Sequence, residues 1–167
     1  MSSRTKLPGF LVAAALAAFA LTVRASIKEG DLFPFPAPGA ISGALPDIGG
    51  KVVMVDFWAS WCGPCRASFP AYARLQADFA PRGLVIVAVS IDDTDAAYAA
   101  FLRKYSPAFA TVRDRGQNLA ALVGIPGMPA TYLIDRRGRI RFVHEGFHSG
   151  RTEPVLRGQI EKLLAEK

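Results

Sequence analysis

The chain has 167 residues, of which 51% are hydrophobic, and a formal net charge of +6. This length suits one domain, and the apolar content is enough for a hydrophobic core. Three cations and no acids lie in the first 25 residues, so the remainder carries only +3. That modest charge gives no electrostatic basis for binding nucleic acid, and we expect no nucleic-acid partner.

Residues 1–25 differ in composition from the rest of the chain. A basic start with Arg4 and Lys6 precedes an uncharged stretch over 7–23, and small residues follow it. This order is typical of a secretory signal peptide. The uncharged stretch also lies at the short end of lengths that span a bilayer, so a retained N-terminal membrane anchor is the alternative. Both interpretations predict a periplasmic or other extracytoplasmic location.

The next segment, 26–40, contains the run Phe33-Pro34-Phe35-Pro36-Ala37-Pro38-Gly39. Proline lacks an N–H donor, so this run suits neither a helix nor a central strand. We predict an extended lead-in whose phenylalanines pack against the domain. Residues 41–167 are predicted to form that domain, beginning with a short edge strand and turn over 41–50.

After Lys51 the sequence shows a regular succession of strand and helix patterns. Continuous apolar runs predict strands that are buried on both faces at 52–58 and 84–90. The remaining predicted elements are helices at 62–79, 95–104, 118–123 and 152–166, a strand at 109–113, and a hairpin of 131–135 and 140–144. This order predicts an α/β domain whose central sheet has helices on both faces.

The only two cysteines, Cys62 and Cys65, lie directly after the first predicted strand. Residues three apart in a helical turn share a face and are close enough for a disulfide. Unpaired N–H groups and the helix dipole at a helix N-terminus lower a thiol pKa, which predicts that Cys62 is the nucleophile. Cys65, one turn deeper, is predicted to resolve the mixed disulfide. Pro64 suits the first turn, where its missing N–H has no intrahelical partner.

A cysteine pair can also form a structural disulfide, bind a metal or attach haem. A permanent disulfide that closes so small a loop contributes little stability. A zinc site would need two further ligands, and His144 and His148 are not spaced as a partner pair. Arg66, rather than histidine, follows Cys65, which excludes covalent haem attachment. We expect no metal and no cofactor other than the Cys62–Cys65 disulfide.

Four segments resemble the thioredoxin superfamily and, within it, the exported, often membrane-tethered TlpA/ResA-like thiol–disulfide oxidoreductases. These segments are 55–66, 123–131, 132–135 followed by Gly138, and the signal-like start. The resemblance extends over about residues 30–165. It implies a thioredoxin fold with a central mixed β-sheet.

The resemblance also implies roles for further residues. Pro129 matches the family's cis-proline beside the disulfide, with an ordinary trans turn proline as the alternative. The backbone of Met128 would pair with an extended substrate segment. Asp56 matches the buried acid behind the resolving cysteine, and it would accept the proton of Cys65 if burial raises its pKa. The alternative for Asp56 is a solvated acid at a strand end.

Trp61 would cover the pair and, with Gly63 and Pro64, form a contact surface for partners. Two departures limit the analogy. Many relatives carry glutamate where this chain has Ser68, so no acid role is transferred to that position. The region before Lys51 is also shorter than the family's usual N-terminal hairpin.

We therefore expect a monomeric, exported enzyme that exchanges its disulfide or dithiol with protein clients, mainly as a reductant. A reductant in that compartment needs a membrane electron donor. The resemblance links such reductants to cell redox homeostasis and cytochrome c maturation. The alternatives are a thiol oxidase or isomerase, a thiol peroxidase, and a metal- or peptide-binding module. A peroxidase would have a Pro-x-x-x-Thr pattern before the nucleophile, where this chain has Val55 and Ala59.

Overall fold

The computed structural model describes residues 26–37 and 39–166. The predicted signal peptide or anchor over 1–25 lies outside these residues. Among the residues that are described, no helix is both long enough and apolar enough to cross a membrane.

The elements follow the predicted order. The strands are β1 (Val52–Trp58), β2 (Leu84–Ser90), β3 (Ala110–Arg113), β4 (Ala130–Ile134) and β5 (Ile140–Glu145). The helices are α1 (Gly63–Phe79), α2 (Asp95–Tyr105), α3 (Asn118–Val123) and α4 (Thr152–Ala165), with short 3₁₀ helices at Ala80–Arg82 and Arg115–Gln117. Gly83, at φ +102°, reverses the chain between the first 3₁₀ helix and β2, a conformation that glycine adopts without strain.

The five strands form one mixed sheet in the order β3-β2-β1-β4-β5. The first three strands are mutually parallel, and β4 runs antiparallel to both β1 and β5. The ends of β1, β2, β3 and β5 therefore share one sheet edge with the start of β4. We call this edge the exit edge, because β1 leaves the sheet there toward the cysteine pair.

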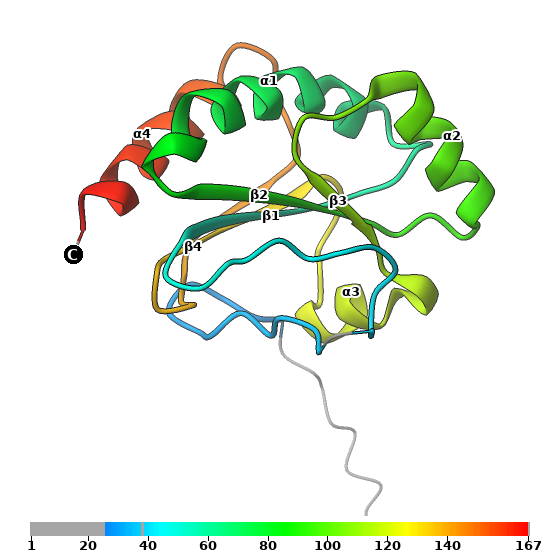
Figure 1. Cartoon of the computed structure of the whole chain (residues 1–167), viewed down its shortest axis with the longest axis horizontal. Helices are drawn as coiled ribbons and strands as arrows, with labels where there is room; N and C mark the ends of the chain where they lie inside the picture. The colour runs from blue at the N-terminus through cyan, green and yellow to red at the C-terminus, as the bar shows by residue number, and fades with distance from the viewer. Residues whose placement is uncertain (1–25, 38, 167) are drawn as a thin grey trace, which may run out of the picture.

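Helices cover both faces of the sheet, as predicted. Figure 1 shows α1, α2 and α4 on one face, and α3 with the N-terminal segment on the other. Aromatic rings join β1 to the first two helices: the Trp58 ring centroid is 4.9 Å from that of Phe69 and 4.3 Å from that of Phe101. This cluster of buried rings fixes α1 and α2 above the end of β1.

The proline-containing lead-in lies against the domain, as expected. Phe33 is buried, and its ring centroid is 5.8 Å from that of Tyr132 on β4. The prediction of an edge strand within 41–50 is wrong: only Ser42 pairs, in an isolated bridge to Arg113. Glycines and Pro46 in this segment cannot sustain a ladder, because proline lacks a donor and glycine weakens a strand.

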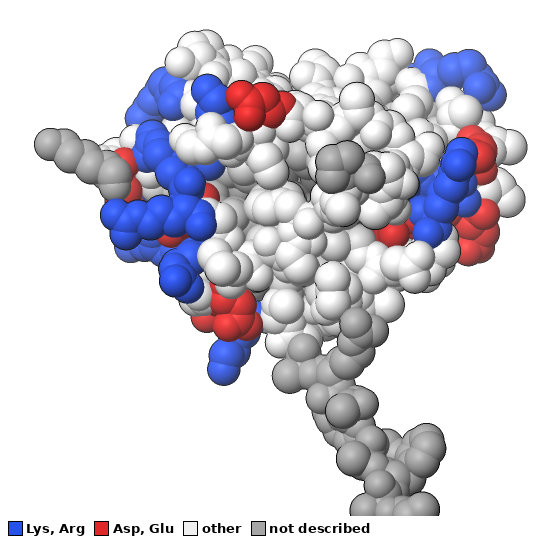
Figure 2. Space-filling view, turned by 60° about the horizontal axis from the view of Figure 1, so that its bottom comes forward, with Lys and Arg blue, Asp and Glu red and all other residues white. Residues whose placement is uncertain are grey.

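Charged side chains are unevenly spread over the face that carries the lead-in. In Figure 2, cations and anions lie together toward the two sides of this face, and the surface between them is uncharged. On the left of this view the cations predominate over the acids, and on the right a smaller group contains both signs.

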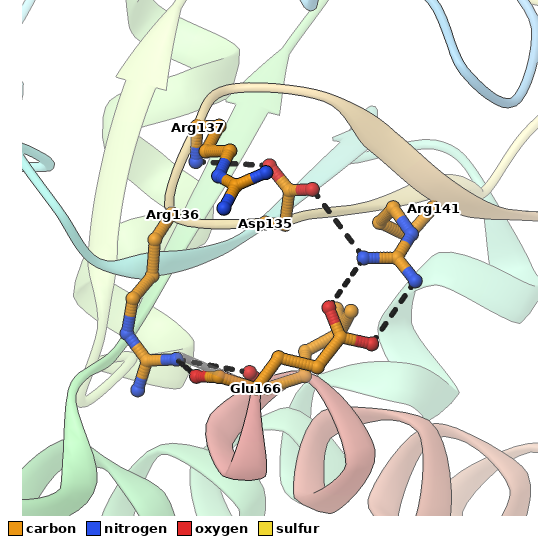
Figure 3. A pocket seen from close by; sticks show the side chains of 6 residues that line it. Asp135, Arg136, Arg137, Arg141 and Glu166 are labelled. Carbon is orange, nitrogen blue, oxygen red and sulfur yellow. Dashed lines mark hydrogen bonds and ion pairs between the residues drawn. The ribbon is translucent and has the colours of Figure 1, made fainter.

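Arginines of the β4–β5 turn and of β5 hold the end of α4 (Figure 3). The Arg136 guanidinium donates to the carbonyls of Leu163 and Leu164, at 3.1 Å each, and to that of Glu166. Arg141 pairs with the Glu166 carboxylate. These bonds satisfy carbonyls at the C-terminal end of a helix, where a cation is also favoured by the dipole. These arginines lie at the opposite end of β4 from the exit edge and are a structural feature.

Candidate active site

The cysteine pair occupies the first turn of α1. Cys62 and Cys65 are joined as a disulfide, with their Cα atoms 5.3 Å apart. Cys62 is the N-cap residue, and its Sγ accepts a hydrogen bond from the Cys65 N–H at 3.2 Å. Cys62 keeps 6% of its surface exposed, whereas Cys65 has none. The more accessible sulfur is therefore the one that faces the free N–H groups of the helix.

The residues around the pair differ strongly in exposure. Trp61 is 64% exposed, and the neighbouring Gly63 and Pro64 are also exposed. Trp58, four residues before the pair, is fully buried. An exposed indole beside a nearly buried sulfur forms an apolar rim at which another protein can make contact.

The turn between β1 and α1 is held by a carboxylate from the end of β2. Asp92 is buried, and its Oδ1 accepts bonds from the Ser60 N–H at 3.0 Å and the Ser60 hydroxyl at 2.7 Å. Its Oδ2 accepts from the Ser90 hydroxyl at 2.8 Å. The backbone immediately before Trp61 and Cys62 is thereby tied to the neighbouring strand.

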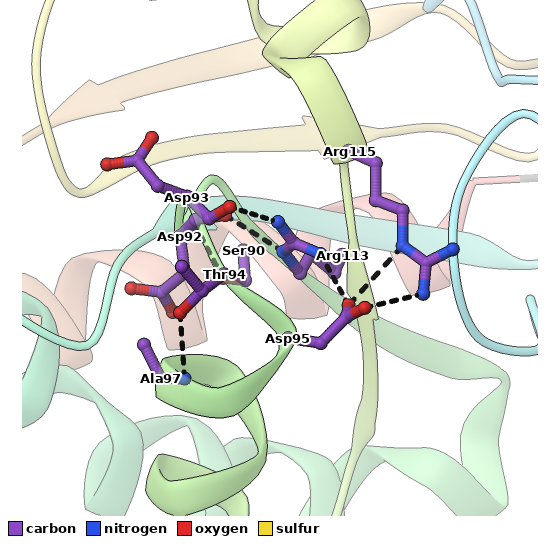
Figure 4. A network of polar contacts seen from close by, with 8 residues as sticks. All are labelled: Ser90, Asp92, Asp93, Thr94, Asp95, Ala97, Arg113 and Arg115. Atoms are coloured by element: carbon purple, nitrogen blue, oxygen red, sulfur yellow. Dashed lines mark hydrogen bonds and ion pairs between the residues drawn. The ribbon is translucent and has the colours of Figure 1, made fainter.

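An arginine extends this network to the end of β3 (Figure 4). Arg113 is buried, and its Nε donates to the Asp92 carbonyl at 2.8 Å. Its Nη2 donates to the Asp93 carbonyl at 2.7 Å, and Nη1 forms an ion pair with Asp95. The loop after β2, which supplies the carboxylate for Ser60, is thus itself fixed.

Asp56 is fully buried in the middle of β1, so the alternative of a solvated acid is wrong. Its Oδ1 accepts hydrogen bonds from the Thr131 hydroxyl at 2.7 Å and the Tyr72 hydroxyl at 3.0 Å. Burial raises the pKa of Asp56 to about 7, although both hydroxyl bonds act in the opposite direction. The carboxyl therefore exchanges a proton near neutral pH, which is the condition for an acid–base role.

Pro129 is brought to the same edge of the sheet as the cysteines. The Met128–Pro129 peptide bond is cis, as the resemblance implied. Phe57, near the end of β1, pairs with Ala130 at the start of β4, so Pro129 lies at the exit edge. The Pro129 carbonyl accepts from the Gly146 N–H at 2.7 Å. The backbone of Met128 has no hydrogen bond to any residue that the structure describes.

Residues 39–143 match the model of the AhpC/TSA family, which covers well over half of the chain.

The chain belongs to the AhpC/TSA family.

The curated proteins that it resembles include thiol–disulfide oxidoreductases named ResA. It is 38% identical to the thiol-disulfide oxidoreductase ResA of Oceanobacillus iheyensis over 61% of this chain and 53% of that protein. It is 32% identical to ResA of Bacillus thuringiensis over 71% of this chain and 67% of that protein. The chain thus spans between about half and two thirds of the length of these curated relatives.

A solved structure agrees with the fold. The thioredoxin-like domain superposes on a protein of Chlorobium tepidum assigned to the thiol:disulfide interchange protein DsbE, with a TM-score of 0.77 and 37% identity. The match covers 84% of this chain and all of that one. The predicted thioredoxin fold is therefore confirmed.

Ser68 is buried, and its hydroxyl donates to the Cys65 carbonyl at 2.8 Å. Ser68 therefore supports the first turn of α1 and supplies no acid. His144 bonds to Gln159 through its ring Nε2, at 2.7 Å. Among the described residues, no group of three or more His, Cys, Asp or Glu is placed to hold a metal ion.

Three residues of the site were not singled out from the sequence: Tyr72, Asp92 and Thr131. Tyr72 lies on α1 seven residues after Cys65, a spacing of two turns that places both on one face. Asp92 follows directly after a buried strand, and Thr131 opens the predicted hairpin. The spacing from Cys65 was a usable signal for Tyr72, whereas Asp92 and Thr131 gain their partners only through tertiary contacts.

Because Asp56 is buried, we predict that its ionisation lowers the free energy of unfolding in a pH-dependent way. Between pH 4 and pH 7 the unfolded chain releases the Asp56 proton while the folded chain retains it, so stability falls across this window. Asp56→Asn removes this loss. We expect the variant to be more stable than the wild type above pH 7, by roughly 4 kcal/mol at about 1.4 kcal/mol per pKa unit, and to gain little at pH 4.

Denaturant unfolding at pH 4 and pH 8 measures this difference. Glu161→Gln, at an exposed carboxylate without an ion pair among the described residues, is the control and should show no such gain. An Asp56→Asn gain that is equal at both pH values would contradict a raised pKa.

Proposed function

We propose that this chain is an exported reductant of protein disulfides that uses the Cys62–Cys65 pair. The observation that carries the proposal is the pair itself: Cys62 caps α1 with its sulfur facing the Cys65 N–H, while Cys65 is fully buried. Such a setting stabilises a thiolate at Cys62 and shields the resolving thiol from solvent. The ResA relatives, named as thiol–disulfide oxidoreductases, agree with this chemistry.

The reaction begins with the reduced pair. The Cys62 thiolate attacks a client disulfide, forms a Cys62–client mixed disulfide and releases one client sulfur as a thiolate. Cys65 then gives its proton to the Asp56 carboxylate and attacks the Cys62 sulfur as a thiolate. This step forms the Cys62–Cys65 disulfide and releases the second client thiolate. The client gains two electrons, and the pair loses two.

Asp56 suits the second step because its pKa is close to neutral. A base of that pKa accepts a thiol proton and later returns it without a large energetic penalty in either direction. Asp56 and the Gly63-Pro64 dipeptide together support the reductive direction, since both resemble reducing thioredoxins.

Client docking is assigned to the exposed surface around the pair. Trp61, Gly63 and Pro64 form its exposed rim, and Pro129 lies at the same edge of the sheet. An extended client segment would pair with the N–H and carbonyl of Met128, which have no partner among the described residues. Backbone pairing of this kind recognises extended clients without demanding a particular sequence.

The proposal places the enzyme outside the cytoplasm. Residues 1–25 would direct export as a cleaved signal or hold the protein at the membrane, 26–40 form the lead-in, and 41–167 form the catalytic domain. The reductive cycle needs a membrane dithiol donor to regenerate the pair. The clients would be disulfide-containing proteins, including those that need reduced cysteines during cytochrome c maturation, and the enzyme would act as a monomer.

Cys65→Ser should convert exchange into trapping. Without a resolving thiol, Cys62 remains attached to its client. Reduced Cys65→Ser protein incubated with excess insulin should therefore accumulate a one-to-one mixed disulfide, visible on a non-reducing gel and by mass spectrometry. Cys62→Ser is the matched control and should trap little. Equal trapping by both variants, or none by Cys65→Ser, would contradict the assigned order of attack. Rapid reduction of hydrogen peroxide by the reduced wild type, one equivalent for each Cys62–Cys65 dithiol that is oxidised, would instead favour the peroxidase alternative.

The reduction potential tests the direction of electron flow. Equilibration of the full chain with dithiothreitol and glutathione buffers should give a value near that of thioredoxin, about −270 mV, rather than that of the oxidant DsbA, about −120 mV. A value close to that of the oxidant would overturn the reductive assignment while leaving thiol–disulfide exchange intact.

A further inference from the structure

The carboxyl of Asp56 is held by two hydroxyl groups from different elements. Tyr72, on the buried face of α1, places its hydroxyl oxygen 3.0 Å from Asp56 Oδ1. Thr131, opposite Asp56 in the β1–β4 pairing, places its hydroxyl oxygen 2.7 Å from the same atom. The two hydroxyl oxygens are also 3.0 Å apart. The three groups form a closed triangle that water does not reach.

The bonds around this triangle distinguish the two oxygens of the carboxyl. Each hydroxyl carries one hydrogen, and the shortest contact directs the Thr131 hydrogen to Oδ1. The Tyr72 hydrogen points either to Oδ1 or to Thr131. In both arrangements Oδ1 acts as an acceptor. Oδ2 is buried and has no hydrogen-bond partner among the described protein atoms.

We propose that Tyr72 and Thr131 are positioning residues for the exchange reaction, which hold Asp56 Oδ1 as an acceptor and leave Oδ2 to carry the proton. This inference rests on the proposed function and assigns the atom for its second step. The Cys65 S–H bond breaks, the proton forms an O–H bond at Asp56 Oδ2, and the sulfur retains the electron pair with which it attacks Cys62. Tyr72 and Thr131 keep their own hydrogens throughout.

Among the described residues, the hydroxyls of Tyr72 and Thr131 are the side-chain groups that form hydrogen bonds with Asp56. β2 places Ala88 opposite it, and β4 contributes Thr131. α1 contributes Tyr72 together with Cys65, which is the other titratable group on its buried face. No Lys, Arg or His forms a hydrogen bond or ion pair with Asp56 among the described residues. Burial, followed by the Asp56 charge, raises the pKa of Tyr72 well above its usual range, so its hydroxyl remains a donor at neutral pH.

A second hydroxyl pair in the same protein provides the comparison. The Tyr98 hydroxyl donates to the Thr111 hydroxyl at 3.1 Å, and neither hydroxyl bonds to a carboxylate. Tyr98→Phe therefore removes a tyrosine–threonine bond of the same type without a direct effect on Asp56. Tyr98 is only partly buried, so this variant controls for the loss of a tyrosine–threonine bond and not for the loss of a fully buried hydroxyl.

The first experiment measures the pKa of the Asp56 carboxyl directly. Carbon-13 NMR of the reduced full chain, labelled at aspartate carboxyls and assigned with Asp56→Asn, gives the Asp56 pKa in each variant. Removing a donor to Oδ1 should raise that pKa in Tyr72→Phe and in Thr131→Val, by about half a unit or more, a threefold change in protonation ratio. Thr131→Ser keeps the hydroxyl and should restore the wild-type value, and Tyr98→Phe should leave it unchanged.

A kinetic measurement tests the proton transfer. The rate at which Cys65 releases glutathione from a Cys62–glutathione mixed disulfide should have its pH midpoint displaced upward in Tyr72→Phe and Thr131→Val, in step with the carboxyl pKa. At pH 7 we expect these variants to be at least about twofold slower than the wild type, with Thr131→Ser close to it.

The outcomes separate this inference from the proposed function. An Asp56 pKa that does not move in Tyr72→Phe and Thr131→Val, or that moves equally in Tyr98→Phe, overturns the positioning role. A moved pKa with an unmoved pH midpoint of release refutes proton transfer to Oδ2. If the wild type releases no glutathione, the proposed function fails, and the carboxyl pKa values still decide whether the two hydroxyls position Asp56.

Discussion

The hydrogen bond from the Cys65 N–H to the Cys62 sulfur is the interaction on which the rest of the site depends. It exists because β1 ends at Trp58 and α1 begins at Gly63, so that Cys62 takes the N-cap position. The free N–H groups of a helix can stabilise an anion only if the preceding turn presents it to them. Asp92 holds that turn through Ser60, and the fold thereby supports the reactivity of one sulfur atom.

Asp56 shows how this protein accepts a loss of stability at its active site. A buried carboxyl with a pKa near 7 must either remain protonated or carry an uncompensated charge in an apolar core. The hydroxyls of Tyr72 and Thr131 reduce that penalty without removing it. The result is a group that binds a proton at neutral pH next to a helix whose buried face also carries Cys65. A well-packed apolar side chain at this position would favour stability and lose the proposed proton acceptor.

Much of the fold was predictable from the sequence because its signals are local. The apolar runs of β1 and β2 are uninterrupted, and glycine or proline follows the helices between them. The prediction of an edge strand within 41–50 was wrong because the few apolar residues there suggested a strand, while the glycines and Pro46 prevent continuous pairing. The strand order did not follow from local patterns, because it depends on which strands meet in space.

The residues of the site likewise differ in whether local sequence signals could predict them. Cys62 and Cys65 could be assigned from their spacing and from the strand that precedes them, and Asp56 and Pro129 from resemblance to a family. Tyr72 could be placed on the face of α1 that carries Cys65, but its partners, like those of Thr131 and Asp92, could not be assigned. Each bond joins residues distant in the chain: Tyr72 meets Thr131 across 59 positions, and Asp92 meets Ser60 across 32. Such bonds become visible only when the sheet and α1 are assembled.

The most direct test of the account is the pKa of the Cys62 thiol in the reduced protein, measured in Cys65→Ser by thiolate absorbance and by alkylation rate as a function of pH. Capping of α1 predicts a pKa clearly below the ordinary value of about 8.5. A Cys62 pKa at or above that ordinary value would contradict the claim that the helix N-terminus activates this sulfur.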